Sequence, residues 1–263
     1  MLRRKFAVWL GLVVILTLIS SLPLFAAEIG KDVKVTYLGQ SAFKIVSPKD
    51  VVIYLDPYLS KNPKTPEEMK TVERADFILV THGHFDHLGD TLAIAEKTNA
   101  KIVAMHELAY YLTKKGAKNV IGMNKSGTYT SLGIAFTMVP ASHSSGIFEG
   151  DQIIYAGDPI GFVIKFENGF TLYHAGDTGV FGDMKIIGEI YQPELSMLPI
   201  GSHFTMGPRE AAYAAKLIGS KYVIPMHYGS SPLLTGTVED FLKWMKDVPQ
   251  TKVLVLKPGE TVQ

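Results

Sequence analysis

The chain has 263 residues, of which 47% are hydrophobic, so it can form one sizeable domain with a core or two fused halves. Its formal net charge is +1, and without residues 1–27 it has 23 basic and 25 acidic side chains, or about −2. A nearly neutral surface argues against a nucleic-acid partner and leaves small molecules and lipids as ligands. The chain contains no cysteine, which excludes a disulfide framework and leaves nitrogen and oxygen atoms as metal ligands.

The first 27 residues have the form of a secretory signal peptide. A basic start at residues 3–5 precedes an apolar stretch over residues 6–19, and a proline and small residues follow. We therefore expect residues 28–263 to form the folded domain, and the protein to be exported to the periplasm or beyond the cell. The third position before either cleavage point is Phe25 or Leu24 rather than a small residue, so an uncleaved, membrane-anchoring N-terminus stays open.

The first half of the remaining chain contains short strands and helices. Alternating or continuous apolar residues predict strands at 33–39, 42–46, 51–55, 77–80 and 101–104. Helical patterns predict helices at 90–97 and 106–115, the second with His106 as an ordinary surface or capping residue. Residues 60–74 are polar and contain prolines, which indicates a loop and then a short surface helix.

A cluster of polar residues directly follows the strand at residues 77–80. It places three histidines and one aspartate within six positions, as His82, His84, Asp86 and His87. Imidazole nitrogens and carboxylate oxygens bind divalent transition metals, and several polar groups beside a core are costly unless they bind something. The pattern therefore predicts a metal site at the end of this strand, and a solvated histidine-rich loop is the alternative.

Polar side chains also follow strands in the second half. Strands are expected within 118–140, the last at 134–139, within 151–176 as a set of three, and at 195–200, 221–225 and 253–256. Helices are expected at 182–191, from Pro208 onward and at 241–246. His143 lies in a serine-rich loop, where a lone histidine is usually solvated. His203 follows a strand and is either an acid or base that contacts substrate or a structural loop residue.

The pattern of His82, His84, Asp86 and His87 resembles the signature of the metallo-β-lactamase fold hydrolases. Within that superfamily, the chain resembles small metal-dependent hydrolases related to ascorbate-phosphate lactonases and to phospholipase D-type N-acyl-phosphatidylethanolamine hydrolases. The likeness extends over about residues 33–258, because later motifs recur in the expected order. It implies an α/β fold of the αββα type, in which two β-sheets lie between layers of helices in one domain.

The resemblance also implies two divalent metal ions, held by His82, His84 and His143 on one ion, Asp86, His87 and His227 on the other, and Asp177 between them. Nitrogen and oxygen ligands suit Zn²⁺ best, although Mn²⁺ and Fe²⁺ also fit. Asp56 is expected to orient a ligand histidine rather than serve only as a turn residue before proline. His174 is expected behind the ligands, and at Gln40 similar proteins often carry histidine.

The resemblance implies a dinuclear hydrolase, the N-terminal pattern predicts that it is exported, and the nearly neutral charge leaves a small-molecule or lipid-like substrate. A hydroxide held by the metals would attack an ester-like bond, with a lactone or other carboxylic ester favoured over a phosphodiester. Asp86, Asp177 and His203 are the candidate catalytic residues. The alternatives are an iron-dependent redox enzyme on the same fold and a non-catalytic metal-binding module. The sequence leaves open which aromatic residues face the substrate among Tyr58, Phe85, Phe148, Phe181, Phe204 and Tyr228.

Overall fold

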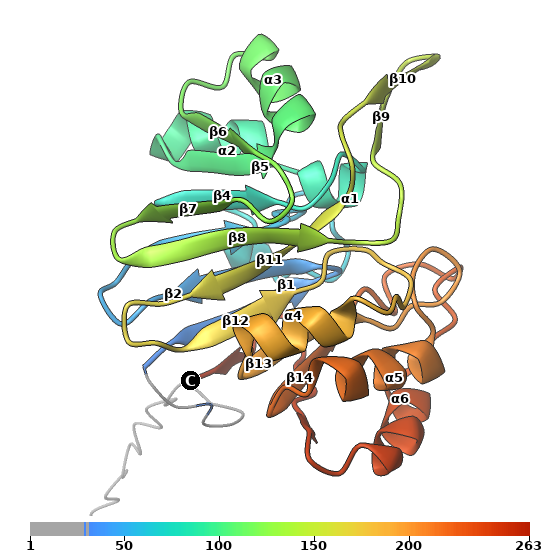
Figure 1. Ribbon diagram of the computed structural model, residues 1–263. Coiled ribbons are helices and arrows are strands. Elements are labelled where there is room, and N and C mark those ends of the chain that lie inside the picture. Colours follow the sequence, from blue (N-terminus) through green and yellow to red (C-terminus); the bar gives the residue numbers. More distant parts are fainter. Residues whose placement is uncertain (1–28, 30–31) are drawn as a thin grey trace, which may run out of the picture.

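The computed structural model describes Ile29 and residues 32–263, so the expected signal peptide at residues 1–27 lies outside the described part of the chain. Within that part, two seven-stranded sheets face each other and helices cover the outer face of each sheet (Figure 1). No helix of the described residues combines the length and the hydrophobicity that crossing a membrane requires. The predicted αββα arrangement is confirmed.

The first sheet is formed mainly by the N-terminal half. Its strands lie in the order β16 (Thr261–Val262), β1 (Lys34–Gly39), β2 (Ala42–Val46), β3 (Val52–Leu55), β4 (Phe77–Val80), β5 (Lys101–Met105) and β6 (Val120–Met123). Neighbours from β16 to β3 are antiparallel, and neighbours from β3 to β6 are parallel. Consequently β1, β3 and β4 all end at the same edge of the sheet.

The second sheet repeats this mixture of pairings. Its order is β15 (Lys252–Val253), β14 (Tyr222–Met226), β13 (Leu195–Pro199), β12 (Thr171–His174), β11 (Ile160–Lys165), β8 (Ile134–Pro140) and β7 (Thr128–Ser131). The strands from β12 to β15 are parallel, while β7, β8, β11 and β12 pair as antiparallel neighbours. Strands β8, β12 and β14 therefore also end at a common edge.

Apolar side chains fill the space between the layers. Between the sheets, the rings of Phe77 in β4 and Phe136 in β8 lie 4.9 Å apart. The first sheet is covered by α2 (Thr91–Thr98) and α3 (His106–Lys114), and the second by α4 (Met184–Tyr191), α5 (Pro208–Ile218) and α6 (Val238–Trp244). Helices α4 and α5 approach closely at Gly188, where a Cβ atom would lie 2.2 Å from the carbonyl oxygen of Ile218.

Several short elements differ from the sequence expectations. A one-turn helix α1 (Phe85–Leu88) contains part of the histidine cluster, and β9 (Gly146–Glu149) pairs with β10 (Gln152–Tyr155) in a separate hairpin (Figure 1). The expected strand at 253–256 is only the two-residue β15, and the chain end adds β16 to the first sheet. Two 3-10 turns, η1 (Glu67–Met69) and η2 (Met245–Asp247), complete the described elements. Of these segments, η1 matches the short helix expected within residues 60–74 and β10 is the first of the three strands expected within 151–176, whereas α1, β9 and β16 are too short for periodicity to identify.

Candidate metal centre

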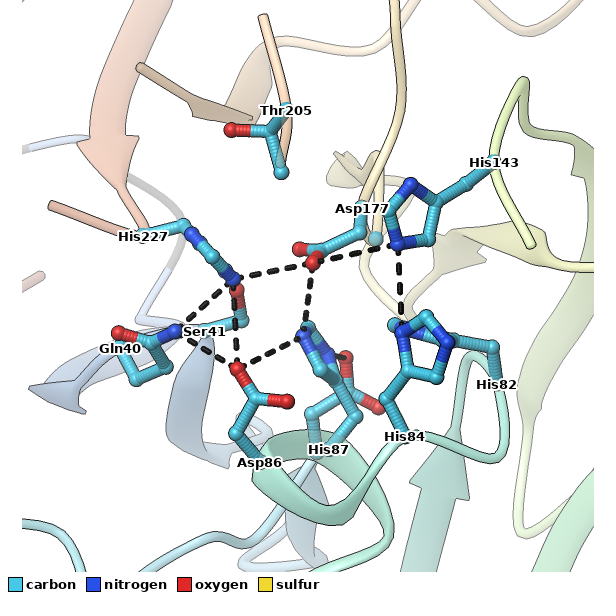
Figure 2. A network of polar contacts seen from close by, with 12 residues as sticks. Gln40, Ser41, His82, His84, Asp86, His87, His143, Asp177, Thr205 and His227 are labelled. Carbon is cyan, nitrogen blue, oxygen red and sulfur yellow. Dashed lines mark hydrogen bonds and ion pairs between the residues drawn. The ribbon is translucent and has the colours of Figure 1, made fainter. Parts of the chain in front are cut away.

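The predicted ligand residues come together at the edge where the two sheets meet (Figure 2). His82, His84, Asp86 and His87 follow β4, while His143, Asp177 and His227 follow β8, β12 and β14. Backbone contacts join the sheets here, since the amide of His227 donates to the carbonyl oxygen of Gln40 at 2.7 Å. Both halves of the chain therefore contribute to one cluster.

The loop after β4 is shaped by a glycine. A Cβ atom at Gly83 would lie 2.7 Å from that of Ala156 and 2.8 Å from Cγ1 of Ile147, so only glycine allows the β9–β10 hairpin to pack here. The amide of Gly83 also donates to Ser145 Oγ at 3.1 Å. This close packing holds the segment between His82 and His84 in place.

Three neutral histidines form one side of the cluster. Nδ1 of His84 lies 2.9 Å from Nε2 of His82 and 3.3 Å from Nε2 of His143. Burial lowers the pKa of all three imidazoles, most strongly for the fully buried His82. Each ring therefore keeps a lone pair that a metal ion can use.

The other side combines histidines with carboxylates. Nε2 of His227 lies 2.9 Å from Oδ2 of Asp177 and 3.4 Å from Oδ2 of Asp86, and Nε2 of His87 lies 3.2 Å from Oδ2 of Asp177. Burial lowers the pKa of His227, but the two carboxylates outweigh it and raise the pKa to about 9. Burial also lowers the pKa of His87, but the neighbouring carboxylates outweigh it and raise the pKa. At Asp86, burial raises the pKa, but His87 and His227 outweigh it and lower the pKa to about 2.

Asp177 lies between the two sides. Its Oδ2 is 3.7 Å from Nε2 of His143 as well as close to His87 and His227. The residue is 3% exposed, and its Oδ1 has no hydrogen-bond partner. A buried carboxylate oxygen without a partner is costly, and a bound cation would remove that cost.

The donor set fits divalent metal ions. Three overlapping groups each place their ligand atoms within 4.8 Å of one another: His82, His84 and His143; His82, His87 and Asp177; and Asp86, His87 and His227. All seven side chains offer nitrogen or oxygen atoms, which zinc, manganese and iron accept. The residues present could therefore hold metal on both sides of Asp177.

Residues behind the cluster orient the ligands. Oδ2 of Asp56 accepts from Nδ1 of His87 at 2.7 Å, and both its oxygens accept from Thr81, at 2.8 Å from the amide and 2.7 Å from the hydroxyl. The Thr81 hydroxyl oxygen also lies 3.0 Å from Nδ1 of His82. These contacts place the Nε2 atoms of both histidines toward the cluster, as expected of Asp56.

His174 also lies outside the donor groups, as the sequence suggested. Its Nε2 donates to the carbonyl oxygen of Ser41 at 3.0 Å, and its Nδ1 accepts from the amide of Gly176 at 3.2 Å. Both ring nitrogens are thus occupied by backbone groups. His174 links the two sheets behind the site.

Gln40 is a site residue whose role the sequence did not reveal. It lies in the β1–β2 turn, and its Nε2 is 2.8 Å from both Oδ2 of Asp86 and Nε2 of His227 (Figure 2). Its Oε1 accepts a hydrogen bond from Ser230. The amide therefore contacts the acidic side of the cluster, through residues distant in sequence.

The two remaining histidines lie apart from the cluster. His203 is exposed and its ring contacts Phe204, with centroids 4.4 Å apart, and it is absent from the residues that line the cavity over the cluster. Its catalytic role stays a prediction. His106 is exposed at the start of α3, as expected.

The cavity over the cluster has a volume of about 630 Å³. Of the six aromatic residues in question, Tyr58, Phe85, Phe148 and Phe204 line it. Phe181 and Tyr228 instead pack against the apolar cluster under the helices of the second sheet. The cavity is therefore lined by aromatic side chains as well as by residues of the ligand cluster.

A family model described as a β-lactamase superfamily domain matches residues 52–228, which contain the whole donor set. The chain belongs to the metallo-β-lactamase superfamily. A UPF0173 metal-dependent hydrolase from Koribacter versatilis is 51% identical over 231 residues, covering 88% of this chain and 98% of that protein. Another from Methanosarcina mazei is 47% identical over 232 residues, covering 88% and 99%.

A solved structure supports the same assignment. Igni18, described as a novel metallo hydrolase from the archaeon Ignicoccus hospitalis, superposes with a TM-score of 0.77 at 38% identity, covering 88% of this chain and 97% of that chain. The predicted superfamily, fold and enzyme class are therefore confirmed: the chain is a member of the UPF0173 metal-dependent hydrolases within the metallo-β-lactamase superfamily.

Proposed function

We propose that this member of the family is an exported, dinuclear metal-dependent hydrolase. Its reaction is the attack of water on an ester-like bond of a small-molecule or lipid-like substrate, with a lactone or other carboxylic ester favoured over a phosphodiester. The observation that carries the proposal is the set of three overlapping donor groups, which share His82 and His87 and extend to both sides of Asp177. One ion would use only part of these ligands.

We assign His82, His84 and His143 to one ion, Asp86, His87 and His227 to the other, and Asp177 to both. Zn²⁺ is the expected metal because the ligands are imidazoles and carboxylates, and Mn²⁺ and Fe²⁺ remain compatible with the same atoms. Bound at these positions, divalent ions would lower the pKa of a water molecule and polarise the scissile bond. No serine nucleophile is then required.

The protein's own groups position these participants. Asp56 fixes His87, and Thr81 fixes His82, so that both rings offer Nε2. The carboxylates of Asp86 and Asp177 line the cavity, where each can accept a hydrogen bond from the attacking water. The side-chain nitrogen of Gln40 donates to Oδ2 of Asp86 and so holds that carboxylate toward the cavity.

Metal content and hydrolysis together test the proposal. We expect elemental analysis of the purified protein to give about two zinc ions per chain, as two-metal sites contain. Metal-dependent turnover is expected on a panel of lactones, carboxylic esters and phosphodiesters. His84→Ala and Asp177→Ala should each lose about 100-fold or more in kcat/KM. His106→Ala, which changes an exposed histidine outside the site, is the matched control and should retain full activity.

Two outcomes would favour the alternatives. Bound iron with oxygen-dependent activity would indicate a redox enzyme on the same fold. Bound metal without turnover on any of the three substrate classes would indicate a metal-binding module. Equal turnover by wild type and Asp177→Ala would refute the assignment of the bridging carboxylate.

Export is proposed from the basic and apolar pattern of residues 1–27. We expect the protein to be found outside the cytoplasmic membrane, with an N-terminus near Glu28 when the signal is cleaved. Mass spectrometry of protein isolated from cell fractions decides between cleavage and an anchored form. Recovery of the full-length chain in the cytoplasm alone would contradict export.

A further inference from the structure

Apolar side chains make up a large part of the lining of the cavity over the metal centre. We define the apolar wall as Tyr58, Phe85, Phe148, Phe204, Leu233 and Leu234, all of which line the cavity. Three of its members have little protein around them: Phe85 is 72% exposed, Phe148 is 68% exposed and Phe204 is 53% exposed. Large apolar side chains gathered around a concave surface indicate a binding site for an apolar ligand.

The charge of the cavity points to the same kind of ligand. Among the described residues that line it, none is lysine or arginine. Phosphate groups are usually bound by such cations, so a phosphate remote from the scissile bond would find no partner here. The polar lining consists of the metal-centre residues, Gln40 and three serines, Ser144, Ser230 and Ser231. This arrangement suits an uncharged ester with a hydrocarbon substituent.

The β9–β10 hairpin projects from the two sheets (Figure 1), and its residue Phe148 lines the cavity. Phe148 of β9 is paired directly with Ile153 of β10, so the two side chains lie on the same face of the hairpin. Ile153 is 69% exposed and does not line the cavity. A flexible chain that enters past Phe148 can therefore continue along this face.

The hairpin is anchored to the metal centre. Its opposite face carries Ile147, which is 6% exposed and packs where only Gly83 leaves space. Glu149 forms an ion pair of 2.6 Å with Lys115, the residue directly after α3. Phe148 is thus held at a fixed place beside the ligands rather than on an unsupported loop.

We propose that the substrate is an uncharged carboxylic ester or lactone with a medium or long aliphatic acyl chain, which lies against the apolar wall and along the Phe148–Ile153 face. This inference rests on the proposed hydrolytic function and specifies its substrate class. In hydrolysis, water adds to the acyl carbon, the bond from that carbon to the alkoxy oxygen breaks, and the proton from water passes to the leaving oxygen. An ester gives an acid and an alcohol, a lactone opens to a single hydroxy acid, and water is the only other reactant.

A chain-length series tests the inference. With zinc-loaded protein and the p-nitrophenyl esters of acetate, butyrate and octanoate, kcat/KM should rise by about fourfold for each additional buried methylene. Bis(p-nitrophenyl) phosphate should be a poorer substrate than the octanoate ester. Phe148→Ser should lower the ratio of kcat/KM for octanoate to kcat/KM for acetate by about tenfold. Tyr213→Ser, which removes an exposed aromatic ring on α5, is the matched control and should leave the series intact.

A binding measurement separates this inference from the proposed function. Octanamide, titrated calorimetrically into chelator-treated protein, should bind, acetamide should not, and Phe148→Ser should weaken octanamide binding. Octanamide binding without turnover of any ester or phosphodiester would refute the hydrolase and leave the apolar site standing. Turnover that is independent of chain length, or a failure of octanamide to bind, would overturn the acyl-chain proposal while hydrolysis itself could still hold.

Discussion

Asp56 Oδ2 lies 2.7 Å from Nδ1 of His87, and this contact determines which nitrogen of His87 faces the metal centre. In Asp56→Asn, an amide nitrogen or a weaker acceptor replaces the carboxylate, so Nε2 of His87 is more often protonated and unable to bind metal. We expect zinc affinity to fall by about 10- to 100-fold. Competition with a chelator of known affinity measures this change.

Asp76→Asn is the matched control for that prediction. Asp76 also lies beside the first sheet and its Oδ2 accepts from the amide of Val52 at 2.8 Å, but it has no contact with a ligand histidine. Its variant should bind zinc normally. Equal loss of zinc affinity in both variants would show that general disturbance of the sheet, and not orientation of His87, is responsible.

Metal-free protein should be most stable near pH 6.5, the ordinary pKa of histidine. Despite burial, neighbouring carboxylates raise the folded-state pKa of His87 and His227, so their contribution is lost as pH rises above 6.5 toward about 9. Burial lowers the folded-state pKa of His82, His84 and His143, so stability is also lost as pH falls below 6.5. Thermal unfolding in a chelator from pH 5 to 9 should show this maximum.

His227→Gln tests whether the histidines of the site, rather than other titrating groups, cause the loss of stability above pH 6.5. Without the imidazole, the decrease in melting temperature between pH 6.5 and 9 should become smaller, because one of the two raised pKa values is removed. The decrease below pH 6.5 should remain. An unchanged alkaline limb in the variant would assign that limb to groups outside the site.

Gly201 allows the loop after β13 to pass beside His227. A Cβ atom at Gly201 would lie 2.1 Å from the carbonyl oxygen of His227, so Gly201→Ala must displace one of the two backbones. We expect a loss of about 1–3 kcal/mol in the free energy of unfolding, together with weaker zinc binding. Gly182→Ala, where a Cβ atom meets nothing within 4 Å, should change neither quantity. Urea unfolding and zinc titration check both variants, and normal zinc binding by Gly201→Ala would separate this packing from the site.

Gln40→Met keeps the length of the side chain and removes its donor. The buried side of Asp86 then loses the 2.8 Å hydrogen bond from Nε2 of Gln40, which should cost about 1–3 kcal/mol in metal-free protein. Urea unfolding in a chelator measures the loss, and Gln152→Met in the exposed part of β10 provides the control. Equal stability of the two variants would mean that the contact with Asp86 contributes nothing.

The ligands that the sequence revealed share a local signal. His82, His84, Asp86 and His87 immediately follow an apolar strand, and the parallel strands β12 and β14 deliver Asp177 and His227 to the same edge. Strand direction explains why such residues meet, whereas the αββα fold and the ligands His143, Asp177 and His227 were predicted from the resemblance to the metallo-β-lactamase fold hydrolases.

Other features depend on contacts between distant segments. Gln40 contacts Asp86 and His227, and nothing in the sequence of the β1–β2 turn indicates these contacts. Likewise, Phe148 lines the cavity whereas Tyr228 packs under a helix, although both follow a ligand histidine within a few residues. The exposure of a side chain depends on what packs over it, and the sequence of one segment does not contain that information.

The division of the ligands between the two sheets has a mechanical consequence. Metal held by His87 and His227 would fasten the N-terminal sheet to the C-terminal sheet and close a long stretch of chain between them. Because these ligands meet only in the folded chain, bound metal would stabilise the folded state as well as complete the site. Starvation for metal would then make the protein easier to degrade, so that its abundance in the organism follows the supply of the ion.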